Sequence, residues 1–228
     1  MIVIKNTTAR RILRAVLPFV LIPAIVILGI FAVESQYHAF VSFFVAVCSL
    51  LLFLCGFEKK KIGSRRLVIV AVMIALSVVG RMFPVIKPVT AFAVISGMFL
   101  GAEAGFLVGS FSALISNFYF GQGPWTPFQM LAWGLIGFLA GVLASPLKKS
   151  RLFLYFYGIL AAVGYSLLMD VWSAVWLAGE FLPSLYFAKL LTSLPHTALY
   201  AASNVIFLIL FAKPFSEKLG RIKIKYGV

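Results

Sequence analysis

The sequence predicts an all-α integral membrane protein, in which a six-helix transmembrane bundle follows an extra N-terminal transmembrane hairpin, giving about eight helices. Three observations predict this class. Hydrophobic residues make up 63% of the 228 residues and charged residues only 11%, whereas a soluble domain carries roughly 25% charged residues. The apolar residues form segments near the length of about 20 residues that crosses a bilayer. The basic residues collect between alternate pairs of these segments.

Eight apolar segments follow one another along the chain. Their expected bounds are Ala15–Val33, Ala39–Gly56, Leu67–Gly80, Pro88–Leu100, Ala104–Phe120, Pro127–Ser145, Leu152–Ala178 and Tyr186–Ala212. The third and fourth segments are short for full spans. We therefore expect them to tilt, to extend into the adjoining loops, or to be partly re-entrant.

The basic residues are distributed very unevenly over the loops. Of the 20 Lys and Arg, 17 lie before the first segment, after the eighth, or in the loops after the second and sixth. If the eight segments alternate across the bilayer, all 17 fall on one side, and only Arg81, Lys87 and Lys189 fall on the other. Basic residues are retained on the cytoplasmic side of membranes. Both termini are therefore expected in the cytoplasm, and the net charge of +14 needs no nucleic acid to explain it.

The N-terminal part of the chain is expected to be a separate membrane hairpin. Its first apolar stretch is long for a signal peptide, and Ala32-Val33-Glu34 is a poor cleavage site, so we expect it to be retained. The basic run Glu58–Arg66 predicts a boundary, with the hairpin over residues 1–63 and a six-helix membrane domain over 64–228. Cys48 and Cys55 have no nearby His or acid to complete a metal site, and no cofactor is expected.

Small residues recur with helical spacing at two places. Gly97, Gly101, Gly105 and Gly109 are four residues apart, which stacks them on one face and lets a neighbouring helix approach closely. The series crosses an expected tight turn at residues 101–104, so it should serve two helices rather than one. Ala71 and Ala75 form a second, shallow patch that could dock a partner helix, although alanine pairs are also common in membrane helices.

The stretch from Ser116 to Gln129 is expected to form an external loop that binds substrate. Two glycines and two prolines give this loop a fixed backbone shape. It places three amides beside aromatic rings, and its candidate binding residues are Asn117, Tyr119, Gln122, Trp125 and Gln129. Neutral hydrogen-bonding groups beside aromatic faces suit a polar, uncharged or zwitterionic small molecule. The alternative is an interfacial aromatic belt with a turn, which needs no ligand.

The seventh segment contributes three more candidate binding residues. Asp170 is the one acid that the sequence places deep in a span, where an ionisable group is costly and points to a function. It could pair with Arg81 or Lys189, or it could contact the ligand. Trp172 and Trp176 lie one turn apart and could line a pocket or anchor the helix at the interface. The remaining polar candidate in a span, His196, is expected to be structural.

Several motifs that would indicate an enzyme are missing. The sequence has no G-x-x-x-x-G-K-[ST] loop, no H-E-x-x-H pair and no serine nucleophile elbow. The chain is therefore not expected to be an enzyme or to hydrolyse ATP by itself. Two other classes stay open: a stand-alone ion-coupled carrier, with Asp170 as its coupling acid, and a membrane assembly or scaffold protein, for which the glycine series would suffice.

Residues Ser64–Lys213 resemble the substrate-binding (S) subunits of energy-coupling factor (ECF-type) vitamin transporters. The resemblance rests on the pair Ala71 and Ala75, on glycine-rich helices that precede the loop from Asn117 to Gln129, and on six helices with both ends inside. The stretch Phe120–Pro127 is similar to a cobalamin-type subset. Family members commonly have six helices, so the N-terminal hairpin departs from the family pattern.

This resemblance implies a mechanism and a set of partners. Such a subunit, in a bacterial cell membrane, binds a vitamin at its external face and passes it inward through a transmembrane coupling subunit and two ATPase subunits, tipping over in the bilayer as it does so. Ala71 and Ala75 would contact the coupling subunit. The external loops Arg81–Lys87, Gln122–Thr126 and Gly179–Leu185 would cover the ligand.

Overall fold

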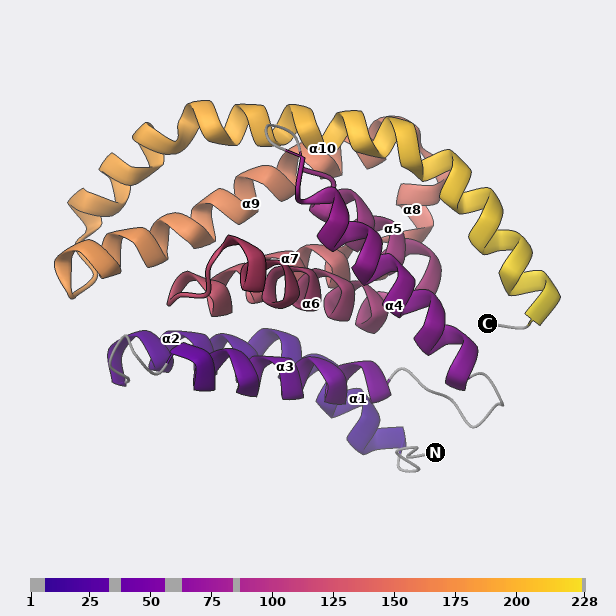
Figure 1. Ribbon diagram of the computed structural model, residues 1–228, viewed down its shortest axis with the longest axis horizontal. Helices are drawn as coiled ribbons and strands as arrows, with labels where there is room; N and C mark the ends of the chain where they lie inside the picture. The colour runs from indigo at the N-terminus through magenta and orange to yellow at the C-terminus, as the bar shows by residue number, and fades with distance from the viewer. Residues whose placement is uncertain (1–6, 33–37, 56–62, 84–86, 227–228) are drawn as a thin grey trace.

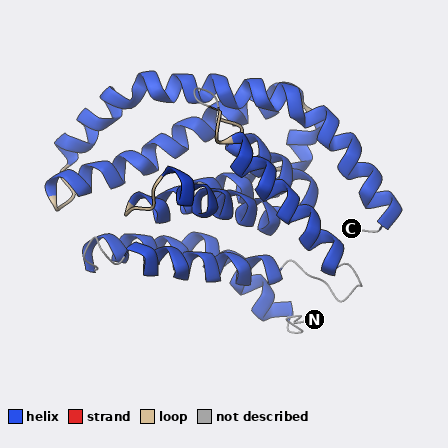
Figure 2. Ribbon diagram, viewed as in Figure 1, coloured by secondary structure: helices blue, strands red, loops and turns tan. Residues whose placement is uncertain are grey.

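The computed structural model describes residues 7–32, 38–55, 63–83 and 87–226, and these are helical almost throughout (Figure 1). No strand occurs in these ranges (Figure 2), which confirms the all-α prediction. The elements in chain order are α1 (Thr7–Val16), the π-helical stretch η1 (Leu17–Leu21), α2 (Ile22–Ala32), α3 (His38–Cys55), α4 (Gly63–Gly80), α5 (Val89–Leu100), α6 (Ala102–Phe120), α7 (Trp125–Val142), α8 (Ala144–Lys149), α9 (Arg151–Ala178) and α10 (Pro183–Tyr226).

The eight predicted apolar segments all fall on helices, the first of them on the consecutive elements α1, η1 and α2, which begin at Thr7 and not at Ala15. The predicted ends Val33 and Gly56 lie outside the described residues. Of the other six predicted ends, four agree with the structure and two are wrong. The sixth segment was expected to reach Ser145, whereas α7 ends at Val142 and α8 begins at Ala144. Pro146 explains the break, because a proline fits the first turn of a new helix and disrupts a continuing one. The eighth segment was expected to end at Ala212, but α10 continues to Tyr226 through polar residues that favour helix.

Five helices among the described residues are long and apolar enough to cross a membrane. They are Thr8–Gly29, His38–Cys55, Trp125–Val142, Arg151–Ala178 and Pro183–Ile222. The fourth predicted segment, Pro88–Leu100, corresponds to the shorter apolar helix Val89–Leu100, and the residues of this helix from Val89 to Met98 are buried. This helix is therefore enclosed by protein along most of its length. Its short length had predicted tilting, extension into the loops or a partly re-entrant segment, but not this enclosure.

The helices form layers around α5, α6 and α7 (Figure 1). The long helix α10 arches over α9, with Pro195 and Pro214 inside it, and prolines are a common cause of helix bending. On the opposite side, α2 and α3 pack against α7 and α6. Helix α4 crosses the front of the molecule and packs on α5 and α6.

The glycine series joins both α5 and α6 to α7. A side chain at Gly97 of α5 or at Gly105 of α6 would collide with the backbone of Gly137 in α7. Gly101 forms the connection between α5 and α6 with a φ of 102°, a conformation that residues with side chains rarely adopt. The prediction that the series serves two helices is confirmed, and the expected turn at residues 101–104 shortens to Gly101.

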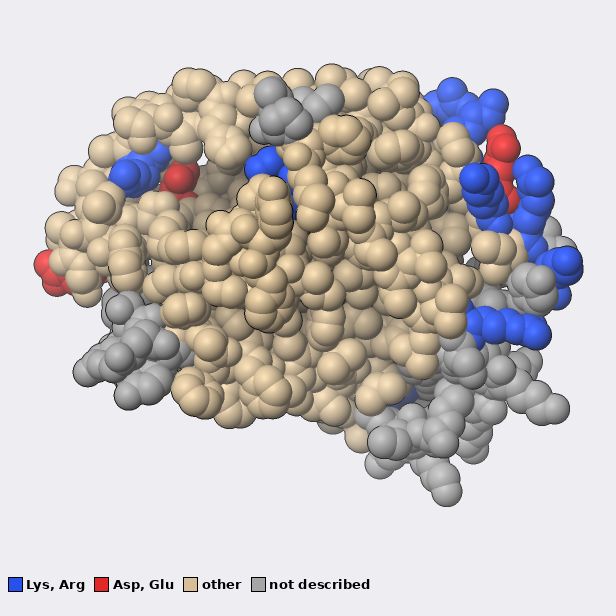
Figure 3. Space-filling model, viewed as in Figure 1, with Lys and Arg blue, Asp and Glu red and all other residues tan. Residues whose placement is uncertain are grey.

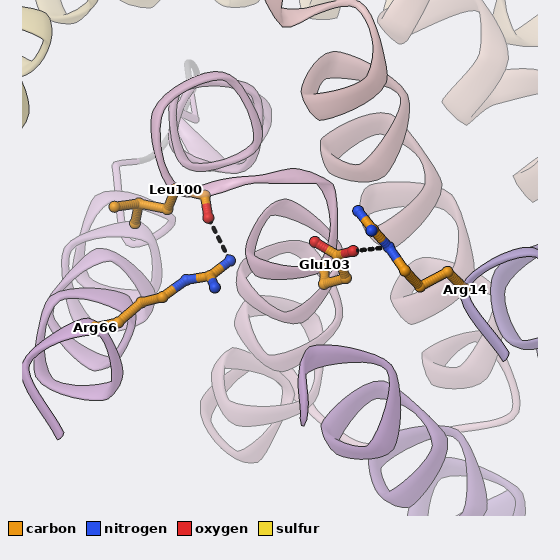
Figure 4. A network of polar contacts seen from close by, with 4 residues as sticks. All are labelled: Arg14, Arg66, Leu100 and Glu103. Atoms are coloured by element: carbon orange, nitrogen blue, oxygen red, sulfur yellow. Dashed lines mark hydrogen bonds and ion pairs between the residues drawn. The ribbon is translucent and has the colours of Figure 1, made fainter. Parts of the chain in front are cut away.

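The two ends of the molecule differ in charge. Figure 3 shows Lys and Arg gathered at the end where α1 and α4 begin and α10 finishes. At this end Arg14 of α1 forms an ion pair with the buried Glu103 of α6 (Figure 4). Beside them, Arg66 of α4 donates a hydrogen bond to the carbonyl oxygen of Leu100. The ion pair joins the N-terminal hairpin to α6, and the hydrogen bond of Arg66 joins α4 to the end of α5. The cytoplasmic orientation of this end stays a prediction.

Candidate functional site

A cavity of about 480 Å³ lies where the connection between α4 and α5 meets α7, α9 and α10. Its lining comprises Arg81, Lys87, Gln129, Trp133, Tyr165, His196, Leu199 and Tyr200. Small-molecule sites usually enclose about 300–1,000 Å³, so the volume suits a small organic ligand. His196 and Leu199 are exposed, which opens the cavity along α10. The space-filling view shows a hollow on this face below α10 (Figure 3).

Arg81 brings a buried positive charge into this cavity. The residue is 7% exposed, and its Nη1 donates hydrogen bonds to Ser116 Oγ and to Asn117 Oδ1, the latter at 2.7 Å. Its guanidinium carbon lies 4.9 Å from the ring centroid of Trp133 and 5.1 Å from that of Phe120. All of these partners are uncharged. They stabilise the guanidinium by hydrogen bonding and cation–π attraction without neutralising it.

Lys87 adds a second positive charge at the other end of the same connection. Its backbone N–H donates to Ser203 Oγ at 3.0 Å, which fixes this point to α10. Its Nζ lies 5.2 Å from the Phe120 ring centroid. Burial, and then the neighbouring charge of Arg81, lower the pKa of the Lys87 ammonium. Both causes oppose the charged form of Lys87, whereas a bound anion would stabilise that charged form.

No carboxylate among the described residues pairs with either cation. The ion pairs found there join Arg14 to Glu103 and Arg221 to Glu217, at the opposite, basic end. Arg81 Nε is buried and has no hydrogen-bond partner. A buried charge without a counter-charge costs several kcal/mol, so this cavity is electrostatically incomplete as it stands.

The three amides predicted to bind substrate are engaged in hydrogen bonds within the protein. Asn117 Nδ2 donates to Thr126 Oγ1 and to Gln129 Oε1, both at 2.9 Å. Gln129 Nε2 donates to Tyr165 Oη at 3.2 Å, and Gln122 Nε2 donates to the Leu114 carbonyl at 2.9 Å. This network fixes the loop between α6 and α7 and holds the acceptor atoms that surround Arg81.

Aromatic side chains form the walls of the cavity. The rings of Trp133 and Tyr165 stack with their centroids 4.9 Å apart, and Tyr165 lies 5.1 Å from Tyr200. Trp133 Nε1 donates a hydrogen bond to Tyr200 Oη, which also bonds to Thr90 Oγ1 at 2.5 Å. Because the polar ends of these rings are tied together across α5, α7 and α10, their flat faces are held in place.

The structure places the predicted loop residues in different surroundings. Gln129 lines the cavity, and Asn117 is buried next to it as a hydrogen-bond acceptor for Arg81. Gln122 and Trp125 are half-buried in and beside the loop. Tyr119 is 72% exposed and stacks edge-on against Phe120. The loop backbone has the expected unusual shape, with Gly121 at a φ of 98°.

The predicted residues of α9 lie in two groups, and neither group is part of the cavity lining. Trp172 forms an aromatic cluster with Trp125 of α7 and with Trp176, at centroid distances of 5.8 and 6.2 Å. Asp170 is buried and accepts a hydrogen bond of 2.6 Å from Ser193 Oγ of α10. Neither Arg81 nor Lys189 forms an ion pair with Asp170 in the described part of the chain.

Sequence reasoning missed Trp133, Tyr165 and Tyr200 as lining residues, and it treated His196 as structural. It expected the loop Arg81–Lys87 to cover the ligand but did not single out Arg81 or Lys87 as binding residues. One signal was available for the two cations. They are two of the three basic residues that break the charge asymmetry, on the side where basic residues are otherwise absent. The three rings carry no such signal, because aromatic residues are frequent throughout this chain.

The predicted docking pair lies on a free face of α4. Ala71 and Ala75 are both exposed, and four apolar neighbours on this helix are exposed with them: Val68, Val72, Leu76 and Val79. The opposite face of α4 packs on α5 and α6. The small side chains therefore make a shallow strip, bordered by larger apolar residues, on the outside of the bundle.

The described residues contain no group of three or more His, Cys, Asp or Glu that could hold a metal ion. Comparison with known proteins gives one family match. Residues 65–219 match the model of the family described as ECF transporter, substrate-specific component. These residues include every side chain that lines the cavity and the exposed strip on α4. No curated protein and no solved structure gives a significant match.

Proposed function

Because the chain belongs to the family of substrate-specific components of ECF transporters, we propose that it captures a vitamin-like small molecule at the external side of the membrane, in the cavity lined by Arg81 and Trp133. The observation that carries this proposal is the buried guanidinium of Arg81, which lines a cavity of about 480 Å³ together with the rings of Trp133, Tyr165 and Tyr200. A buried charge in a membrane protein is costly and is usually retained for function.

The cavity volume narrows the choice of vitamin. The loop Phe120–Pro127 suggested cobalamin, whose corrin ring and nucleotide tail need far more room than about 480 Å³. The volume therefore favours a smaller vitamin. The amides Asn117, Gln122 and Gln129 are engaged with the backbone and with neighbouring side chains, so their observed contacts lie within the protein.

Delivery of the molecule is proposed to depend on a transmembrane coupling subunit and two ATPase subunits. The sequence contains no ATP-binding loop, so any ATP hydrolysis that drives transport would be carried out by partners. The exposed strip around Ala71 and Ala75 is the proposed contact with the coupling subunit, because small residues let two membrane helices approach closely.

Tryptophan fluorescence tests the capture role, since Trp133 lines the cavity. The purified chain is titrated with cobalamin, riboflavin, thiamin, biotin and folate. At least one compound is expected to quench the fluorescence to saturation, and the quenching should shrink in Trp133→Phe. If none of them changes the fluorescence and no other small molecule is found on the protein, the capture role is wrong.

A stand-alone ion-coupled carrier remains the second candidate function. Its support is Asp170, a buried acid whose described hydrogen-bond partner is the neutral Ser193. Reconstitution of the chain alone into vesicles separates the two functions. Uptake driven by an ion gradient and abolished in Asp170→Asn would favour the carrier, whereas uptake that requires added ATPase subunits would favour the ECF mechanism.

A further inference from the structure

The cavity contains an unusual imbalance of charge. Arg81 and Lys87 both line it, and the described residues supply no carboxylate to either. The other titratable lining groups are Tyr165, His196 and Tyr200. None of these is an ordinary counter-anion, because tyrosine ionises only near pH 10 and histidine is neutral or positive. The described residues therefore leave the two positive charges of this cavity without a counter-charge.

The guanidinium is held in a way that leaves it ready to bind. Its Nη1 donates to Ser116 and Asn117, and Nη2 makes only a long contact of 3.4 Å with Gln129 Oε1. Nε is buried without a partner. Arginine binds carboxylate and phosphate most strongly through two parallel N–H groups. The Nη2 and Nε groups of Arg81 are therefore the donors that remain for such a contact.

The remaining walls indicate the shape of the rest of the ligand. Trp133 and Tyr165 are stacked, and Tyr200 is tied to Trp133 by a hydrogen bond. Aromatic faces held in position favour another flat ring, through offset stacking or edge contacts. A volume of about 480 Å³ accommodates one ring system with a short charged substituent.

We propose that the captured molecule is an organic anion, whose carboxylate or phosphate pairs with Arg81 and Lys87 while a flat ring packs against Trp133 and Tyr165. This inference rests on the proposed capture function. It departs from the uncharged or zwitterionic ligand that the loop sequence suggested. It also disfavours cationic vitamins, because a second cation would be repelled by the two already present.

The experiment compares charged compounds with matched neutral ones by isothermal titration calorimetry on the purified chain. Biotin with biotinamide and nicotinate with nicotinamide test a carboxylate, flavin mononucleotide with riboflavin tests a phosphate, and thiamin is the cationic control. In parallel, the small molecule that remains on protein purified from its host is released by denaturation and identified by mass spectrometry.

The charged member of at least one pair is expected to bind about 10- to 100-fold more tightly than its neutral partner, the range for a charge-assisted bidentate contact. Arg81→Gln should bring this ratio close to one. Lys189→Gln is the matched control, since it removes an external positive charge that does not line the cavity, and it should keep the ratio. If Arg81→Gln does not fold, Lys87→Gln is expected to reduce the same ratio.

The outcomes separate this inference from the function on which it rests. The anion inference is overturned if the molecule released from the purified protein is neutral or cationic, or if a neutral or cationic compound binds as tightly as the acids. Either result leaves the proposed capture function standing. An acid preference that survives both Arg81→Gln and Lys87→Gln also overturns it. Absence of any bound or titratable small molecule contradicts the capture function itself.

Discussion

Tryptophan substitutions at Ala71 and Ala75 should separate ligand capture from delivery. Both side chains are exposed on the outer face of α4, and neither lines the cavity. The double substitution therefore adds bulk only where a partner helix is proposed to dock. Exposed positions without internal contacts usually change stability by less than about 0.5 kcal/mol, so ligand affinity should stay within about twofold of the wild type.

The effect on docking follows from the geometry of helix packing. Packed helices lie about 8–10 Å apart, and small residues allow the shorter distances. Overpacking a fitted contact costs about 1–3 kcal/mol for each site. Two substitutions at this strip should therefore weaken association with the coupling subunit by at least about 2 kcal/mol, which is about 30-fold.

The assay measures uptake of labelled ligand in cells that carry the variant with its partner subunits, together with ligand binding by the purified variant. Ala198→Trp with Ala202→Trp is the matched control, because these alanines have the same spacing and are exposed on α10. The α4 variant should lose uptake and co-purification with the partners, whereas the α10 variant should keep both. Normal uptake in the α4 variant, or equal loss in both variants, would refute the docking role.

Three further predictions concern stability and pH. Glu103→Gln removes the buried partner of Arg14. Because the Arg14 side chain is 45% exposed, the loss of folding stability should be modest, about 1–2 kcal/mol, and Tm in detergent should fall by about 2–8 °C. An unchanged Tm would contradict the anchoring of the hairpin. Gly137→Val places methyl groups against the backbone of Gly105 and should lower Tm in the same assay, whereas Gly164→Val, which meets nothing within 4 Å, should not. Burial and Arg81 lower the pKa of Lys87, whereas a bound anion raises that pKa again. Anion affinity measured by calorimetry should therefore fall as the pH rises through the lowered pKa of Lys87 toward about 10.5, the ordinary pKa of a lysine. Lys87→Gln should remove this dependence, and a wild-type affinity that rises with pH would contradict it.

The positions of the helices were predictable because each helix depends on the residues of one continuous stretch of the chain. Apolar segments of membrane length and the positions of basic residues depend only on local sequence. The glycine series was also predictable, since spacing of four places Gly97 and Gly105 on packing faces. The missed ends have local causes as well: Pro146 begins a new helix, and the polar residues beyond Ala212 favour helix without being apolar.

The cavity was less predictable because its residues come from separate parts of the chain. Arg81 meets Trp133, Tyr165 and Tyr200 only after α7, α9 and α10 have packed together. The amide side chains were singled out as candidate binding residues, but sequence alone does not reveal whether an amide faces a ligand or another side chain. Asn117 illustrates the difference, since its oxygen accepts from Arg81 and its nitrogen donates to Gln129.

A native mass spectrum of the protein purified from its host tests the capture role most directly. The structure predicts one small organic molecule, distinct from lipid and detergent, bound to each chain. This mass should be lost or much reduced in Arg81→Gln and in Trp133→Ala, both of which alter the cavity, and retained in Lys189→Gln. A chain that carries only lipid and detergent, or a bound molecule that persists unchanged in both cavity variants, would contradict the proposed site.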